Sequence, residues 1–250
     1  MNALQRLQNN LYPLLTIVFV LVAWQMTVVI WNIPNYILPA PTNVVSALTS
    51  DLPTILDHTK ITVIESFLGF ILAILLAFLL SVLMDSFTIV KKSLYPLLII
   101  SQTVPTIAIA PIIMIWFGFG ILPKVLIIVL VCFFPIAVSL IDGFQKVDQD
   151  FINLFKTMKA NKMQVLFHLK LPSAMVNFFS GLKIAATYMI MTAVISEWMG
   201  GLKGIGVYMV RAKSAYELDK MFASIFVIVI LSIIVIYLID LCAKKVTHWE

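Results

Sequence analysis

The sequence predicts an all-α membrane protein with six transmembrane helices. Of its 250 residues, 62% are hydrophobic and only 12% are Asp, Glu, Lys or Arg, and the mean hydropathy is +1.06. A soluble domain is about half apolar and about a quarter charged. The apolar residues also fall into six stretches, each close to the roughly 20 residues that cross a bilayer. Lipid is therefore the expected solvent for most of the chain.

The six expected spans follow one another within a single transmembrane domain of residues 1–250. Their ranges are 11–31, 60–84, 94–117, 124–141, 174–199 and 221–242. Pro96, Pro105 and Pro111 interrupt the third span. Pro135 lies within the fourth. Because a proline removes a backbone donor, and a freed carbonyl in lipid must be satisfied by protein or by a water-lined cavity, we expect both spans to be kinked or broken and to face the bundle interior.

The distribution of basic residues predicts the orientation of these spans. With the N-terminus inside, ten Lys and Arg residues lie in inner segments, six lie in outer segments and Lys183 lies within a span, which accounts for all 17. Lys and Arg are enriched on the cytoplasmic side of membrane proteins. Because six spans return the chain to its starting side, we expect both termini to be cytoplasmic.

A polar segment at residues 142–172, called here the basic segment, separates the fourth and fifth spans. Its lysines are Lys146, Lys156, Lys159, Lys162 and Lys170. Its apolar residues recur mostly at helical spacing, which predicts one or two short helices within residues 151–171. An amphipathic helix can place its apolar side chains in a groove on another protein. We therefore expect the basic segment to be a cytoplasmic docking surface.

Polar side chains within the third to fifth spans predict a route for a small polar solute, because they would be costly against lipid. These candidates are Gln102, Thr103, Ser139, Thr187, Tyr188 and Thr192. Lys183 lies near mid-depth of the fifth span, where it either pairs with a carboxylate or contacts the solute or a gate. Glu65 and Glu197 lie near the outer ends of their spans, where we expect water to be close.

Sequence motifs for other functions are missing. The chain has no G-x-x-x-x-G-K-[ST], H-E-x-x-H or G-x-S-x-G motif and no C-x-x-C spacing, so it predicts no nucleotide site, metal site or catalytic residue. Its net charge of +5 resides mostly in loops, which argues against nucleic-acid binding. An ion-coupled secondary transporter is an alternative class, but no internal repeat supports it. An intramembrane protease is another, but no span contains a His.

Several runs along the chain resemble the permease subunits of binding-protein-dependent ATP-binding-cassette importers. These runs are Tyr36-Ile37-Leu38-Pro39-Ala40-Pro41, residues 105–111, Trp116-Phe117-Gly118-Phe119-Gly120, Phe133-Phe134-Pro135-Ile136, residues 180–188 and Glu197-Trp198-Met199-Gly200-Gly201. They look like the branch that imports sulfonates, taurine, nitrate and thiamine precursors, and most like its hydroxymethylpyrimidine members. The resemblance implies the type I importer permease fold, a bacterial inner membrane, and a thiamine pyrimidine precursor as substrate, with sulfonate, taurine or nitrate as alternatives.

The family carries a cytoplasmic pattern E-A-A-x-x-x-G, then nine residues, then I-x-L-P. The sequence Leu171-Pro172 matches its end, which puts Lys159 at the glycine. Lys159 must therefore take, at some cost, a turn that glycine would ease, or not turn there. The resemblance implies an ATPase-coupling set in the basic segment. The set is Asn153, Leu154 and Phe155 at the E-A-A positions, Met158, Lys159 and Ala160 at the turn, Leu169 at the isoleucine, and Leu171 and Pro172.

The resemblance also implies partners. Two copies of the permease would pair as a homodimer around the pathway, and an extracytoplasmic substrate-binding protein would deliver the solute. Separate ATPase subunits would bind ATP and Mg²⁺, so this chain itself is expected to bind no cofactor and not to be an enzyme.

Overall fold

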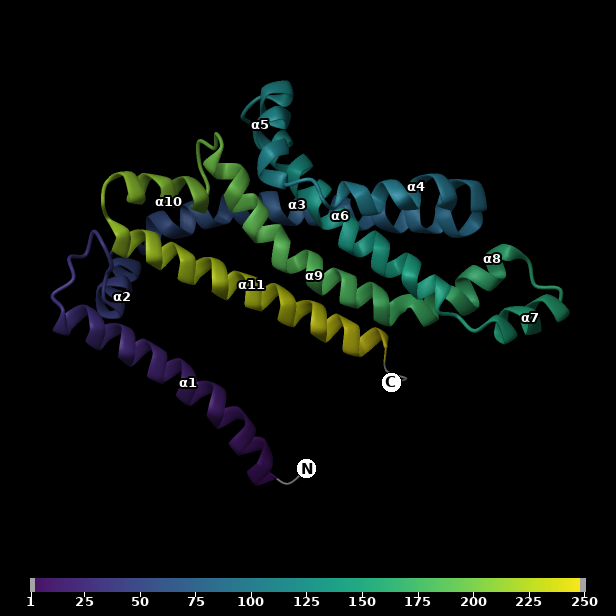
Figure 1. Ribbon diagram of the computed structural model, residues 1–250, viewed down its shortest axis with the longest axis horizontal. Helices are drawn as coiled ribbons and strands as arrows, with labels where there is room; N and C mark the ends of the chain where they lie inside the picture. Colours follow the sequence, from purple (N-terminus) through teal and green to yellow (C-terminus); the bar gives the residue numbers. More distant parts are fainter. Residues whose placement is uncertain (1–2, 248–250) are drawn as a thin grey trace. The chain divides into compact units, whose positions relative to one another are not determined.

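The protein is helical along the part of the chain that the structure describes, which is residues 3–247 of the computed structural model. The long helices are α1 (Ala3–Ile30), α3 (Leu52–Ser86), α6 (Ile121–Gln145), α9 (Leu171–Trp198) and α11 (Leu218–Val246) (Figure 1). The shorter ones are α2 (Pro41–Ser50), α4 (Thr88–Ser101), α5 (Thr106–Phe117), α7 (Gln149–Thr157), α8 (Lys162–Val165) and α10 (Ile205–Ser214). A π-helical turn, η1 (Leu166–Lys170), joins α8 to α9.

The predicted spans are confirmed as helices. Within residues 3–247, five helices are long and apolar enough to cross a membrane, and α4 with α5 forms a bent pair that makes a sixth if counted as one span. The two halves of this pair meet at 103°, and Pro105 is the N-cap of α5. Pro96, Pro111 and Pro135 lie inside continuous helices. The break therefore falls at one of the four prolines considered.

The contacts of the chain divide it into two units, which are described separately. The smaller contains the described residues up to His58 together with residues 208–227. In this unit the Trp24 ring stacks on Phe226 at a centroid distance of 6.5 Å. The Tyr208 hydroxyl donates a hydrogen bond of 2.6 Å to Asp51. This bond lowers the pKa of the Asp51 carboxyl, whereas burial, followed by the same bond, raises the pKa of Tyr208.

The larger unit contains residues 59–207 and the described residues from 228 onward, and α6 and α9 form its centre. Gly181 allows these two helices to approach closely, because a Cβ at this position would lie 2.7 Å from Ser139 Cβ and 2.8 Å from the Pro135 carbonyl oxygen. The core also takes side chains from α3 and α11. Fully buried members are Ala73, Ala77, Ile128, Cys132, Ile136, Ala137, Ala185, Ala186, Met189 and Ala193.

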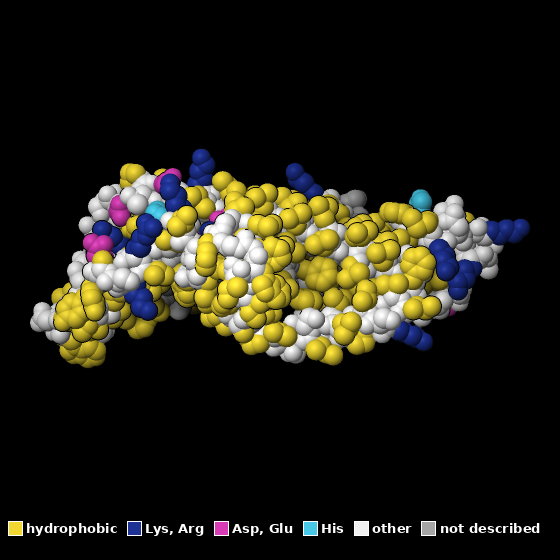
Figure 2. Space-filling view, turned by 90° about the horizontal axis from the view of Figure 1, so that it is seen from above, with side chains coloured by type: hydrophobic (Ala, Val, Ile, Leu, Met, Phe, Trp, Pro, Cys, Tyr) yellow, Lys and Arg dark blue, Asp and Glu magenta, His cyan; other side chains and the backbone are white. Residues whose placement is uncertain are grey.

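Apolar side chains also cover the outside of the larger unit. Leu75 and Leu79 on α3 are 59% and 58% exposed, and Ile89 on α4 is 81% exposed. Figure 2 shows hydrophobic side chains over much of the face that it draws. Burying such surface in lipid is favourable by about 25 cal/mol per Å², so these helix faces suit a bilayer.

Candidate functional site

A polar pocket lies where the α4–α5 break meets α6 and α9. Its volume is about 300 Å³. Its lining consists of Ser101, Gln102, Val104, Thr106, Leu130, Val131, Phe134, Pro135, Tyr188, Met191, Thr192 and Ile195. None of these side chains is acidic or basic, and several are amides or hydroxyls. The polar pocket can therefore hold a small solute through hydrogen bonds and ring contacts.

Proline explains why this pocket forms among spans. Pro105 caps α5 after the break, so residues 102–104 lie outside regular helix, and Gln102 and Val104 line the pocket. Pro135, inside α6, has no N–H, so the Val131 carbonyl lacks its usual helical donor. Val131 lines the same pocket. The break before α5 and the carbonyl freed by Pro135 thus both lie where a polar cavity can satisfy backbone groups.

The structure brings together three of the predicted pathway residues. Gln102, Tyr188 and Thr192 line the polar pocket. Ser101 and Thr106 also line it, although they were not among the predicted residues. Both flank the proline break, and this position in the sequence could have identified them.

The other four candidates lie outside this lining. The Thr103 and Thr187 hydroxyls donate to the carbonyls of Ile100 and Ile184 at 2.7 and 2.6 Å. Ser139 lies at the close contact between α6 and α9. Lys183 forms an ion pair with Asp240 of α11. Pairing with a carboxylate was one of the two alternatives predicted for Lys183.

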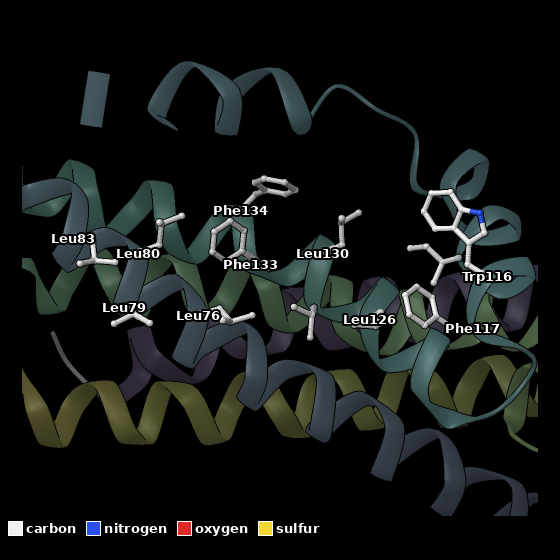
Figure 3. A pocket seen from close by; sticks show the side chains of 12 residues that line it. Leu76, Leu79, Leu80, Leu83, Trp116, Phe117, Leu126, Leu130, Phe133 and Phe134 are labelled. Carbon is white, nitrogen blue, oxygen red and sulfur yellow. The ribbon is translucent and has the colours of Figure 1, made fainter. Parts of the chain in front are cut away.

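A second, apolar pocket of about 680 Å³ lies between α3, α5 and α6. Figure 3 shows its labelled side chains, which are leucine, phenylalanine and tryptophan. Leu130 and Phe134 line both pockets. With almost no polar group, the apolar pocket has nothing to recognise a polar solute, so the polar pocket is the candidate pathway site.

The basic segment contains two short helices, α7 and α8, where one or two were predicted. The Asp148 side chain caps α7 by accepting from the Asp150 N–H at 2.9 Å. Asn161 and Gln164 form a reciprocal capping box at the start of α8. Between them Lys159 has a φ of 58°, so the chain does turn at the position where the family has glycine. The segment is also shorter than expected, because α6 continues to Gln145 and Leu171 already begins α9.

The predicted coupling residues differ in exposure. Leu154 and Met158, four residues apart in and just after α7, are 53% and 72% exposed. Asn153 and Lys159 are also exposed. The remaining members, all half-buried, are Phe155, Ala160, Leu169, Leu171 and Pro172. The exposed apolar pair is suited to contact another protein.

An ion pair ties the basic segment to the transmembrane helices. Lys170 Nζ of η1 lies 2.7 and 3.0 Å from the two carboxylate oxygens of Asp85, near the end of α3. A movement of the basic segment would therefore be transmitted to α3 directly.

A buried polar cluster, called here the Glu197 cluster, lies at the other end of the larger unit. It contains Thr62, Glu65, Lys124 and Glu197. Lys124 Nζ donates to Glu65 at 2.7 Å, and the Thr62 hydroxyl donates to Glu197 at 2.7 Å. The exposures of Glu65, Lys124 and Glu197 are 2%, 4% and 1%. The expectation that water is close to both glutamates is therefore wrong. The packed helices enclose both side chains, and Lys124 lies beside Glu65.

The Gly-rich turn after α9 wraps around the Glu197 carboxylate. The Gly206 N–H donates to it at 2.6 Å. Gly204 has a φ of 126°, and a Cβ there would collide with the carboxyl group. The glycines of this segment therefore leave room for the protein's own Glu197 carboxylate.

The Lys159 turn leads to a prediction about stability. Lys159→Gly should leave assembly intact and raise stability by roughly 1 kcal/mol, because glycine adopts positive φ without the steric cost that a side chain carries. Thermal unfolding of the purified protein measures this. Lys159→Val, which is β-branched, is the contrasting variant and should lower stability. A Gly variant that fails to assemble would show that the ammonium group makes a required contact.

These features define a class: a multi-pass membrane protein with a solute-sized polar pocket among its spans and an amphipathic segment outside them. Within that class, the chain belongs to the family of binding-protein-dependent transport system inner membrane components, whose sequence profile matches residues 67–248. The resemblance to permease subunits of ATP-binding-cassette importers is thereby confirmed, as is a location in the inner membrane. The family consists of permeases rather than enzymes.

Comparisons with individual proteins agree. A probable ABC transporter permease protein of Haemophilus influenzae is 34% identical over 230 residues, covering 92% of this chain and 94% of that protein. The formylaminopyrimidine transport permease protein ThiX of Halalkalibacterium halodurans is 36% identical, covering 92% of both chains. The taurine transport system permease protein TauC of Escherichia coli is 26% identical, covering 94% and 88%.

The fold is also found among solved structures. A chain of the MetNI methionine ABC transporter in an inward-facing conformation superposes with a TM-score of 0.63 at 18% identity. The match covers 78% of this chain and 95% of that one. The type I importer permease fold expected from the sequence is thereby confirmed.

Proposed function

We propose that this permease subunit passes a small neutral heteroaromatic solute, a pyrimidine precursor of thiamine, across the membrane. The observation that carries the proposal is the uncharged lining of the polar pocket. Gln102 and Thr192 offer hydrogen bonds, and Tyr188 and Phe134 offer aromatic faces. The higher identity to a formylaminopyrimidine permease than to a taurine permease supports the same substrate.

The position of the basic groups favours a neutral solute over a sulfonate. A sulfonate would be held best by Arg or Lys, through charge-assisted hydrogen bonds. Among the residues that the structure describes, no Lys or Arg lines the polar pocket. Lys183, the cation deepest in a span, is paired with Asp240. Taurine, other sulfonates and nitrate are therefore the less favoured substrates.

We further propose how transport is driven. Two copies of the chain pair with their polar pockets facing a shared pathway, and an extracytoplasmic binding protein delivers the solute. Both termini and the basic segment are cytoplasmic, and ATPase subunits that bind ATP and Mg²⁺ receive Leu154 and Met158 in a groove. The exposure of these two side chains and the Lys170–Asp85 tie to α3 support this role. Closure of the ATPases would then move the spans through the basic segment.

Uptake in cells tests the substrate. Cells that lack this permease and its neighbouring transport genes should take up labelled hydroxymethylpyrimidine only after the genes are restored. Labelled taurine, measured in parallel, should show no restored uptake. Restored taurine uptake without pyrimidine uptake would overturn the substrate while leaving the family assignment intact.

Cysteine labelling tests the pathway. After Cys132 and Cys242 are replaced by alanine, single cysteines at Gln102 and Tyr188 should react with a water-soluble thiol reagent. The reaction should change between the resting and ATP-bound states. Thr192, which is 2% exposed, should react only in the state whose pathway is open. A cysteine at Ala186, which is fully buried in the core of the larger unit, is the protected control, and equal protection at all positions in both states would contradict the proposal.

A further inference from the structure

A third pocket, called here the lysine pocket, lies where the basic segment meets the corner between α3 and α4. Its volume is about 240 Å³. Its lining consists of Asp85, Ser86, Thr88, Ile152, Lys156, Ala160, Lys162, Val165, Leu166 and Lys170. It is separate from the polar pocket, with which it shares no lining residue.

The lysine pocket carries a net positive charge. Three lysines line it against one carboxylate, Asp85, which already holds Lys170 at 2.7 Å. In the described part of the chain, the charges of Lys156 and Lys162 are therefore not balanced by a further acidic lining residue. Ser86 and Thr88 add hydroxyl groups at the same pocket. Two ammonium groups with hydroxyls nearby suit a phosphate group, which accepts several charge-assisted hydrogen bonds.

The surface beside this pocket is apolar. Phe87 and Ile89 flank Thr88 in the chain, and they are 58% and 81% exposed. A freely dissolved phosphate would leave these two side chains uncovered. A phospholipid would cover them with its acyl chains while its phosphate contacts the lysines. Basic pockets beside transmembrane helices are suited to anionic head groups.

We infer that the lysine pocket binds the head group of an anionic phospholipid. The phosphate lies between Lys156 of α7 and Lys162 of α8, and the acyl chains lie along Phe87 and Ile89. The bound lipid would join both helices of the basic segment to the α3–α4 corner, in addition to the Lys170–Asp85 pair. This assignment does not depend on the transported substrate.

Lipid binding to the full-length permease tests this inference. The protein is purified in a neutral detergent and titrated with phosphatidylglycerol, phosphatidylcholine or inorganic phosphate, and bound molecules are counted by native mass spectrometry. The double variant Lys156→Gln and Lys162→Gln removes the two unbalanced charges. The matched control, Lys91→Gln with Lys92→Gln, removes two charges from α4 that do not line the pocket. Melting temperatures in phosphatidylcholine bilayers show whether both variants fold.

We expect the first double variant to bind phosphatidylglycerol about thirtyfold more weakly, since two lysines near a membrane surface together contribute about 2 kcal/mol to such attraction. The control should bind normally, and phosphatidylcholine should bind the same to all three proteins. Equal weakening in both double variants would mean that surface charge alone attracts the lipid, and would overturn the site. Binding of inorganic phosphate without phosphatidylglycerol would overturn the lipid assignment.

Discussion

Replacing Leu154 and Met158 together by aspartate is expected to uncouple ATP hydrolysis from transport. Both side chains are exposed on the permease alone and are proposed to enter an apolar groove of the ATPase. Burying an unpaired carboxylate there would cost several kcal/mol, enough to lower transport at least tenfold. Transport and ATP hydrolysis, measured in proteoliposomes that contain the full importer, give the ratio of solute moved per ATP.

The matched control for this experiment is Gln149→Asp with Thr157→Asp. It adds the same two charges to α7 at positions that are polar in the native chain, so transport per ATP should stay close to the native value. Full coupled transport by the Leu154→Asp and Met158→Asp variant would show that the exposed apolar pair is not the ATPase contact.

Lys124→Met is expected to destabilise the permease by about 3 kcal/mol or more. The substitution leaves Glu65, which is 2% exposed, without the ammonium group that lies 2.7 Å away. Removing one partner of a buried ion pair is strongly destabilising because a buried charge remains uncompensated. Equilibrium unfolding in detergent, compared with the native chain, measures the change.

The double variant Glu65→Leu with Lys124→Met separates loss of the pair from loss of packing. Replacing both members of a buried ion pair by apolar residues of similar volume is often neutral, so this variant should recover most of the lost stability. If the double variant is as unstable as Lys124→Met, the methionine's shape rather than the unpaired carboxylate is responsible.

Most of the fold could be predicted from the sequence. Apolar stretches of span length predict the transmembrane helices, and prolines within them predict where a helix can break. The bent α4–α5 pair was predictable as a break near three prolines, but not its 103° angle, which depends on how α5 packs on α6. The second span was predicted to begin at residue 60, whereas α3 begins at Leu52. The polar residues His58 and Thr59 interrupt the apolar pattern just before the predicted start. Their burial depends on tertiary contacts that no local pattern reveals.

The candidate site was predictable only in part. Gln102, Tyr188 and Thr192 were selected because polar side chains in spans need an explanation, and these three line the polar pocket. Thr103 and Thr187 are polar residues within spans as well, but each hydroxyl donates a hydrogen bond to the backbone carbonyl three residues earlier. The Glu65–Lys124 pair joins residues 59 positions apart, so helical periodicity gives no indication of it.

The Lys183–Asp240 ion pair affects how the chain enters the membrane during synthesis. A Lys near the centre of a lone span opposes its insertion by about 3 kcal/mol. Among the described residues, the candidate span that contains α9, residues 162–198, has the lowest mean hydropathy of the five, 1.6 against 3.1 for α11. Lys183 emerges from the ribosome before its partner. Because pairing with Asp240 offsets the charge of Lys183, we expect α9 to be more stably inserted once α11 has followed it into the membrane.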